Sequence, residues 1–200
     1  RPTREELAIT PRIMHFGPGA FFRSFVANLI DCVNKKDVGK WGIIAVSLNS
    51  ETTFNKLEGQ DLAFNAMSMS NTKKRAQKVL SISDFIIAKK EGQRVRETLS
   101  DEQIEIVSLT ITEKGYHYDS DKKELEFSNQ NMIDDLENPE NPKTAVGFLV
   151  AGLRDRYLSG KAPFTVLSCD NLPNNGAVVN KITLDFAQKI DPAFAKWISK

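Results

Sequence analysis

The chain of 200 residues carries 27 basic and 26 acidic side chains, and 40% of its residues are hydrophobic. The formal net charge of +1 argues against nucleic acid or an anionic membrane as a partner, and the apolar content is sufficient for one sizeable core. There is no apolar run of about 18 residues and no signal-peptide pattern at residues 1–6. We therefore expect a cytoplasmic protein without membrane contact.

Cysteine and histidine are scarce. Cys32 and Cys169 lie far apart without a dense spacing pattern, which indicates reduced thiols rather than a structural disulfide. His15 and His117 are the only histidines, and no Cys or His cluster has the spacing of metal ligands. We therefore expect no metal site.

A glycine turn between an apolar run and an apolar-periodic segment opens the fold. Residues 12–16 predict a short buried strand, which leads into Gly17-Pro18-Gly19 and then a helix. The continuous apolar run at 41–46 predicts a second buried strand, so a β-α-β unit with a parallel sheet is expected. The face of the helix that we expect to be buried contains Phe21, Phe22, Phe25, Val26, Leu29, Ile30 and Val33.

The next segment predicts a hairpin. Residues 62–69 and 76–82 have the composition of two strands joined by a polar turn. The densest basic cluster, at 73–78, falls in this turn and lacks the interleaved aromatic residues of a nucleic-acid surface. Residues 85–99 are expected to mix helix and turn.

The second half of the chain again alternates strands and helices. Residues 104–110 and 164–168 predict buried strands, while 146–157 and 175–190 predict helices, the first of which ends at Gly160. This alternation predicts an α/β fold with a Rossmann-like, doubly wound, mostly parallel sheet and an inserted hairpin.

Polar clusters follow three of the predicted strands, where ligands bind in open α/β sheets. In the first cluster, Gly17 allows a tight turn and Gly19 lets the backbone approach a pyrophosphate at the start of the following helix. Arg23 is placed for a bidentate phosphate contact. Phe22 occupies the usual third glycine position, so an ordinary strand-helix turn remains open as an alternative. For Arg23 the alternative is a solvated surface arginine.

The other clusters, 110–116 and 168–171, have simpler alternatives too. Glu113 and Lys114 could form an exposed ion pair, and Asp170-Asn171 could cap a turn. Tyr157 and Lys161 have the Tyr-x-x-x-Lys spacing of short-chain dehydrogenases, but Gly160 and Pro163 break the helix, so we interpret the match as coincidence.

Three segments resemble the mannitol dehydrogenase family of long-chain polyol dehydrogenases, which includes mannitol 2-dehydrogenases and fructuronate reductases. They are Ile-Met-His-Phe-Gly-Pro-Gly-Ala-Phe-Phe-Arg at 13–23, Ile-Val-Ser-Leu-Thr-Ile-Thr-Glu-Lys-Gly-Tyr at 106–116, and the most specific one, Phe-Thr-Val-Leu-Ser-Cys-Asp-Asn-Leu-Pro-Asn-Asn-Gly at 164–176. The similarity also extends to residues 41–88 and 141–144.

The resemblance implies an NAD-dependent oxidoreductase that transfers a hydride between nicotinamide and a secondary alcohol or ketone of a sugar polyol, without zinc. Fructuronate reduction is the alternative within the family, and a non-catalytic dinucleotide-binding module is the alternative outside it. Family members carry the general-base lysine in a Lys-x4-Asn-x2-His motif of a helical C-terminal domain, and this sequence lacks the motif. We expect residues 1–200 to be an N-terminal NAD-binding fragment that is inactive alone.

The resemblance also assigns roles to individual residues. Asn171 would be catalytic, helping to hold the oxygen on which charge develops, while Asp170 would organise its loop and Glu113 would lie near the cleft mouth. The residues implied in cofactor binding are Phe16, Gly17, Pro18, Gly19, Ala20, Phe21, Arg23, Glu51, Thr110, Glu113 and Asp170.

Two departures from the family pattern affect these expectations. Ser24 stands where the family usually continues Ala-His. Ser50-Glu51-Thr52 stands where the family often has Ser-Glu-Asp, so one of two acids that favour NAD over NADP is missing. NAD is the expected cofactor, with NADP not excluded.

Overall fold

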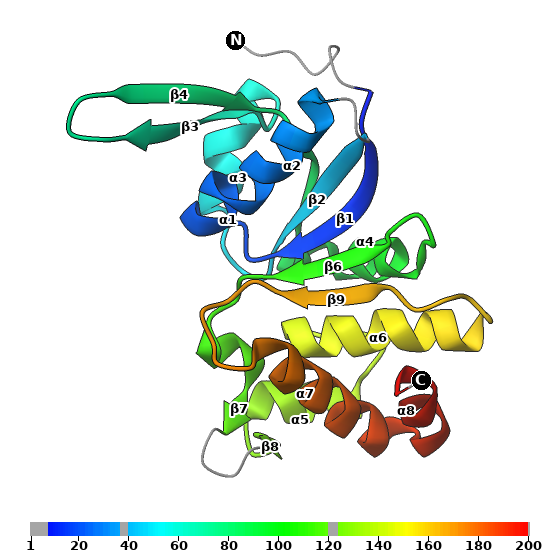
Figure 1. Cartoon of the computed structure of the whole chain (residues 1–200). Coiled ribbons are helices and arrows are strands. Elements are labelled where there is room, and N and C mark those ends of the chain that lie inside the picture. Colours follow the sequence, from blue (N-terminus) through cyan, green and yellow to red (C-terminus); the bar gives the residue numbers. More distant parts are fainter. Residues whose placement is uncertain (1–7, 37–39, 120–123, 200) are drawn as a thin grey trace.

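The computed structural model describes residues 8–36, 40–119 and 124–199, which fold around a five-stranded parallel sheet of order β5-β2-β1-β6-β9. From β1 the chain adds β2 and β5 on one side and β6 and β9 on the other, so the direction of winding reverses between β1 and β6. The predicted Rossmann-like fold is confirmed (Figure 1). The strands are β1 (Thr10–Phe16), β2 (Trp41–Ser47), β5 (Ile82–Ile87), β6 (Ile106–Leu109) and β9 (Thr165–Ser168).

Helices cover both faces of the sheet (Figure 1). One core packs β1, β2 and β5 against α1 to α3, and the other packs the sheet against α4 to α8. Adjacent residues of β1 alternate between the cores, as the strand period requires: Ile13 faces the first and Met14 the second. The helices are α1 (Ala20–Ser24), α2 (Val26–Lys35), α3 (Thr52–Leu57), α4 (Ala88–Ser100), α5 (Gln130–Glu137), α6 (Ala145–Leu158), α7 (Asn175–Ile190) and α8 (Pro192–Ile198), with 3-10 turns η2 (Glu58–Gln60) and η3 (Glu113–Tyr116).

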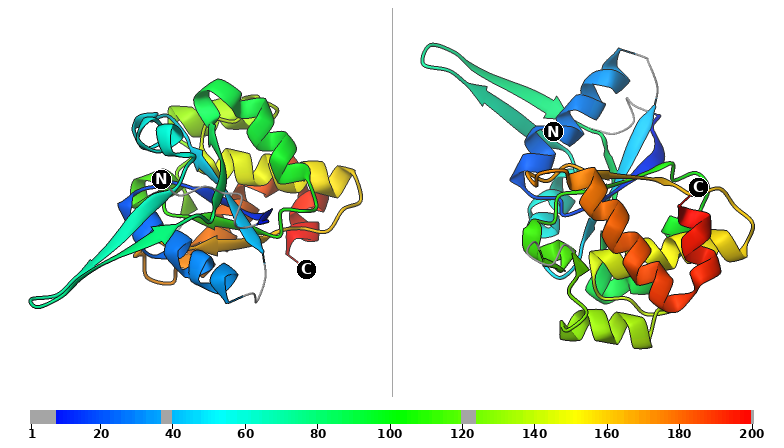
Figure 2. Two further views of the ribbon diagram at one scale, coloured as in Figure 1. Left: turned by 90° about the horizontal axis from the view of Figure 1, so that it is seen from above. Right: turned by 60° about the horizontal axis from the view of Figure 1, so that its bottom comes forward.

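The predicted hairpin is confirmed as antiparallel β3 (Phe64–Met69) and β4 (Lys74–Val79). It projects from the body of the molecule as an arm, with the basic cluster at and beyond its turn (Figure 2). A smaller pair, β7 (Tyr118–Asp119) and β8 (Glu124–Leu125), lies beside α7.

Residues 82–87 were wrongly predicted. The hairpin was expected to end at Ile82 and a mixed helical segment to begin at Phe85, yet Ile82–Ile87 form β5, the third strand of the main sheet. Ser83 and Asp84 interrupt the apolar run, but Ser83 donates to the Ile43 carbonyl at 3.2 Å, so its hydroxyl is satisfied inside the sheet. The helix expected in this region begins only at Ala88.

The expected buried helix face after β1 is confirmed only in part: Phe22 is buried, and Val26 and Ile30 pack against the first core. The segment forms two helices that meet at Phe25, and Phe21, Phe25 and Leu29 are about half exposed, at 54%, 52% and 49%. The buried positions of α2 include two polar residues instead. Asp31 accepts from the Leu80 N–H at 2.8 Å, and Asn34 exchanges two 2.8 Å hydrogen bonds with the backbone of Trp41. These hydrogen bonds attach α2 to the backbone at Leu80 and Trp41. Strand β9, predicted as buried, is an edge strand whose Thr165 and Leu167 are exposed.

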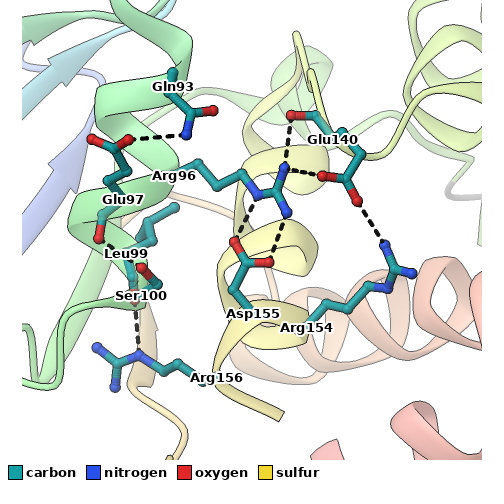
Figure 3. A network of polar contacts seen from close by, with 9 residues as sticks. All are labelled: Gln93, Arg96, Glu97, Leu99, Ser100, Glu140, Arg154, Asp155 and Arg156. Atoms are coloured by element: carbon teal, nitrogen blue, oxygen red, sulfur yellow. Dashed lines mark hydrogen bonds and ion pairs between the residues drawn. The ribbon is translucent and has the colours of Figure 1, made fainter. Parts of the chain in front are cut away.

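Arginine side chains link α4 to α6 (Figure 3). Arg96 makes a two-pronged contact with Asp155, with N–O distances of 2.6 and 2.7 Å, and a further ion pair with Glu140 at 2.6 Å. Arg156 is only 2% exposed and donates to four backbone carbonyl oxygens at the end of α4 and in two loops. The guanidinium thus supplies these carbonyl oxygens at the helix end and in the loops with hydrogen-bond donors that the backbone does not provide.

Within the described part of the chain, no helix is long and apolar enough to span a bilayer, and no three His, Cys, Asp or Glu side chains gather as metal ligands would. Cys32 and Cys169 are both free thiols, as predicted.

Candidate cofactor-binding and catalytic site

The candidate site lies where the winding of the sheet reverses. Phe16 and Leu109, at the carboxyl ends of β1 and β6, pair in register, and the Thr110 N–H donates to the Phe16 carbonyl at 2.9 Å. The turn that begins at Gly17 and the loop that begins at Thr110 are therefore in contact. The loop after β9 lies on the same edge, at the left in Figure 1. Ligands of open α/β sheets bind at such a point.

Gly17 is required by the fold itself. Its φ is +89°, and a Cβ added there would lie 2.1 Å from the Thr110 carbonyl oxygen. Its N–H donates to the Val46 carbonyl at 3.0 Å, which fixes the turn against β2. Any side chain at this position would push β6 away from the turn.

Gly19 differs from Gly17 in this respect. Its backbone angles of −71° and −174° are open to any residue, and an added Cβ would meet only the Gly17 carbonyl oxygen, at 3.9 Å. Nothing in the described structure requires a glycine here. A phosphate can approach the backbone closely only where there is open space in front of a glycine. The turn at Gly19 offers this space and therefore fits a dinucleotide.

A buried histidine holds the turn in place. The Thr110 hydroxyl donates to the Gly17 carbonyl at 2.6 Å, so at 2.8 Å it must accept from Nε2 of His15. Nδ1 is then the acceptor of the Ser108 hydroxyl, at 2.8 Å. The ring stacks on Phe22 of α1 with centroids 3.7 Å apart. Burial lowers the pKa of His15 to about 3, which keeps the ring in this neutral form.

The remaining residues of the first cluster have mixed positions. Arg23 donates from Nη1 to the Pro18 carbonyl at 2.7 Å and approaches the Thr53 hydroxyl at 3.4 Å, so it connects the turn to α3. Ala20 and Phe21 are exposed beside the turn. Phe16 requires a correction, because its ring is fully buried against Phe148 and cannot line a cofactor cleft.

Glu51 lies directly before α3, at the carboxyl end of β2. Its carboxylate is paired with Lys90, in the first turn of α4, at an Nζ–Oε1 distance of 2.6 Å. The acid expected to select NAD is therefore present at the expected edge, but with a cation beside it.

Asp170 holds the loop after β6, which is not its own loop, the one that the resemblance implied it would organise. Its two carboxylate oxygens accept from the N–H groups of Ile111 and Thr112, each at 3.0 Å. Thr112 has a φ of +68°, a strained value for a β-branched residue, so these hydrogen bonds hold an unfavourable backbone in place. The Tyr116 hydroxyl donates to Asp170 at 2.7 Å, and burial raises the pKa of Tyr116, which keeps it a donor.

Asn171 is exposed at this corner, as are Thr112 and Lys114. With Thr112, Lys114 and Asp170 it lines an open pocket of about 410 Å³. Asn175 steadies the loop by donating to the carbonyls of Ser168 and Asp170 at 3.2 and 3.0 Å. These hydrogen bonds fix the backbone of the loop on which Asn171 lies.

The structure brings most of the predicted site residues to one edge. Two residues are exceptions: Phe16 is fully buried, and the side chain of Glu113 lies outside the described part of the structure. The sequence assigned no role to His15, whose apolar neighbours resemble ordinary core positions, or to Tyr116, although the polar cluster 110–116 contains it. It also gave no sign of Lys90, which is 39 positions from its partner in the chain. Only the placement of Lys90 just after a strand could have indicated its role.

Known proteins resemble the chain over almost its full length. A family model described as the mannitol dehydrogenase Rossmann domain matches residues 11–200. The uncharacterized oxidoreductase YeiQ of Escherichia coli K12 is 38% identical over 100% of the chain and 41% of its own length. The polyol:NADP oxidoreductase of Gluconobacter oxydans is 35% identical over 96% of the chain and 40% of its own length.

A solved structure agrees with these matches. The mannitol 2-dehydrogenase of Pseudomonas fluorescens, in a ternary complex with NAD and D-mannitol, superposes with a TM-score of 0.91 and 36% identity over 96% of the chain and 40% of that protein. The chain thus spans about two fifths of the length of these relatives. It belongs to the mannitol dehydrogenase family and contains that family's Rossmann domain.

Proposed function

We propose that the chain is the dinucleotide-binding part of an NAD(P)-dependent dehydrogenase acting on a sugar polyol. The observation that carries this proposal is the contrast between two glycines at the switch point: Gly17 is required by the fold, whereas Gly19 is not. A pyrophosphate passing over Gly19 gives that second glycine a purpose. The bound NAD and D-mannitol of the Pseudomonas fluorescens enzyme support the same assignment.

The residues of this edge fit the two ends of such a cofactor. Glu51 and the carboxyl end of β2 would hold the adenosine ribose, and the turn at residues 17–19, with Arg23, would hold the pyrophosphate. The loops that carry Thr112 and Asn171 would flank the nicotinamide. When bound, the nicotinamide supplies the hydride acceptor or donor.

Asn171 is the catalytic residue that this chain contributes. Its side-chain amide would donate a hydrogen bond to the substrate oxygen, on which negative charge develops as the hydroxyl loses its proton or, in the reverse reaction, as a hydride adds to the carbonyl carbon. An amide cannot take up the hydroxyl proton, so a base must come from elsewhere. Because the family's Lys-x4-Asn-x2-His motif does not occur in residues 1–200, we propose that these residues alone are inactive.

The names of the relatives indicate the substrate class. A polyol such as mannitol, or the matching ketose, is favoured by the named relatives, and reduction of a ketouronate is the alternative, supported by the D-mannonate oxidoreductase of Escherichia coli K12. We further propose that the protein works in the cytoplasm and has no nucleic-acid partner, in keeping with its net charge of +1.

Replacing Gly19 with valine should weaken NADH binding about 10- to 100-fold, the loss of one or two hydrogen bonds to a charged group. The fold should be unaffected, because the site has room for a side chain and its backbone angles suit valine. NADH fluorescence titration together with chemical denaturation measures both quantities.

Two variants control this experiment. Gly59→Val adds the same side chain at another glycine with no atom within 4 Å of its Cβ, and should leave NADH binding unchanged. Gly17→Ala should instead destabilise the fold. Equal NADH affinities for wild type and a well-folded Gly19→Val would remove the basis of the proposal.

A further inference from the structure

The acid at the end of β2 is not an isolated negative charge. Glu51 and Lys90 form an ion pair at 2.6 Å, with 41% and 59% of their side chains exposed. Ion pairs at this exposure contribute little to stability, so a more highly charged anion can displace Glu51 from Lys90 at small cost. An incoming ligand can therefore bind either Glu51 or Lys90.

The surrounding charges favour an anion. Lys89, next to Lys90, lines a pocket of about 470 Å³ with Leu48 and Asn49, beyond the end of β2. On the other side, Arg23 reaches α3 through Thr53, two residues after Glu51. Lys89, Lys90 and Arg23 thus outnumber the single carboxylate of Glu51.

The nearby acids of β5 and α4 do not offset these cations. Asp84 and Glu91 share a single cation, Arg94, so these three groups together carry one net negative charge. Lys89, Lys90 and Arg23 outnumber this charge and that of Glu51. The edge at which a ribose would lie is therefore net positive.

We propose that Lys90 is a specificity-determining residue that lets this edge accept a 2′-phosphorylated adenosine, so that the chain binds NADP(H) as well as NAD(H). The inference rests on the proposed function. A ribose with free hydroxyls is bound by Glu51, and Lys90 stays paired with it. A 2′-phosphate, with a charge of about −1.5 to −2 at neutral pH, takes Lys90 from Glu51 and gains the field of Lys89 and Arg23.

The test compares two ligands that differ only in this phosphate, adenosine 5′-monophosphate and adenosine 2′,5′-bisphosphate, by calorimetric titration of the 200-residue chain. Wild type should bind the bisphosphate at least as tightly as the monophosphate, and added salt should reduce the difference. Lys90→Gln should weaken bisphosphate binding about tenfold, as expected for one lost hydrogen bond to a charged group. Its affinity for the monophosphate should change less than about twofold.

Lys181→Gln is the matched control, because Lys181 is also an exposed lysine paired with a carboxylate, Asp185, at 2.9 Å on α7. It should leave both affinities unchanged. Glu51→Gln should shift the preference towards the bisphosphate.

The outcomes separate this inference from the proposed function. If NADH and the monophosphate bind but the bisphosphate is rejected, or if Lys90→Gln leaves the ratio of the two affinities unchanged, the role of Lys90 is overturned while dinucleotide binding stands. If neither NADH nor either nucleotide binds, both proposals fail.

Discussion

Replacing Asn171 with alanine should lower turnover about 100- to 1,000-fold, as removal of one oxyanion donor does in other enzymes. The measurement needs an enzyme in which this chain is continued by a domain that carries the general base. Because Asn171 is exposed at the rim of the pocket and makes none of the contacts that hold the turn at Gly17, dinucleotide affinity should stay nearly constant. The loss should appear in kcat, measured under saturating NAD(H) and polyol.

A matched variant separates this effect from a general perturbation. Asn65→Ala removes an exposed asparagine on the β3–β4 arm and should leave kcat unchanged. If Asn171→Ala turned over as fast as wild type, or if the loss lay wholly in NADH affinity, Asn171 would not be the oxyanion donor. Measurable polyol oxidation by residues 1–200 alone would contradict the proposed division of labour.

Replacing Arg156 with leucine should lower the free energy of unfolding by about 3 kcal/mol, because several hydrogen bonds from a charged group to buried carbonyls are lost. The guanidinium donates to the carbonyls of Leu99, Asp101, Ile104 and Ala162, and leucine would leave several of these buried acceptors without a donor. Urea denaturation followed by circular dichroism measures the change.

The neighbouring Arg154 provides the comparison. Its ion pair with Glu140 is longer, at 3.5 Å, and more exposed, so Arg154→Leu should cost less than about 1 kcal/mol (Figure 3). Equal effects of the two substitutions would show that the four carbonyls find other partners, and that α4 and α6 do not depend on this contact.

The parts of the fold that follow from local pattern were predictable. The glycine turn, the hairpin and the helix of residues 175–190 each depend on neighbouring residues, and all three are confirmed. Strand β5 was missed because Asp84 breaks its apolar run, and only the pairing with β2 makes the segment a strand.

The buried face of α2 depends on contacts that no periodicity contains. Asp31 and Asn34 are buried because distant backbone groups at Leu80 and Trp41 satisfy them, while three apolar residues remain half exposed. A hydrophobic pattern cannot anticipate a polar residue whose partner lies in another element.

The candidate site divides in the same way. Gly17 is predictable because the turn needs its positive φ, but the freedom of Gly19 is visible only when the space around it is known. The partners of His15, Ser108 on β6 and Thr110 just after it, lie more than 90 positions away along the chain. The hydroxyl groups of these two partners determine the tautomer of His15. Motif resemblance located the edge, and the structure supplied the contacts that hold it.

Backbone amide NMR of the ¹⁵N-labelled chain during titration with NADH locates the dinucleotide on the sheet. If the dinucleotide binds at the carboxyl edge of the sheet, the amides of Gly17, Gly19, Thr112 and Asn171 should shift, while that of Gly42, near the amino end of β2, should not. An unchanged spectrum at millimolar NADH, or shifts centred on the amino edge around Gly42, would contradict the account.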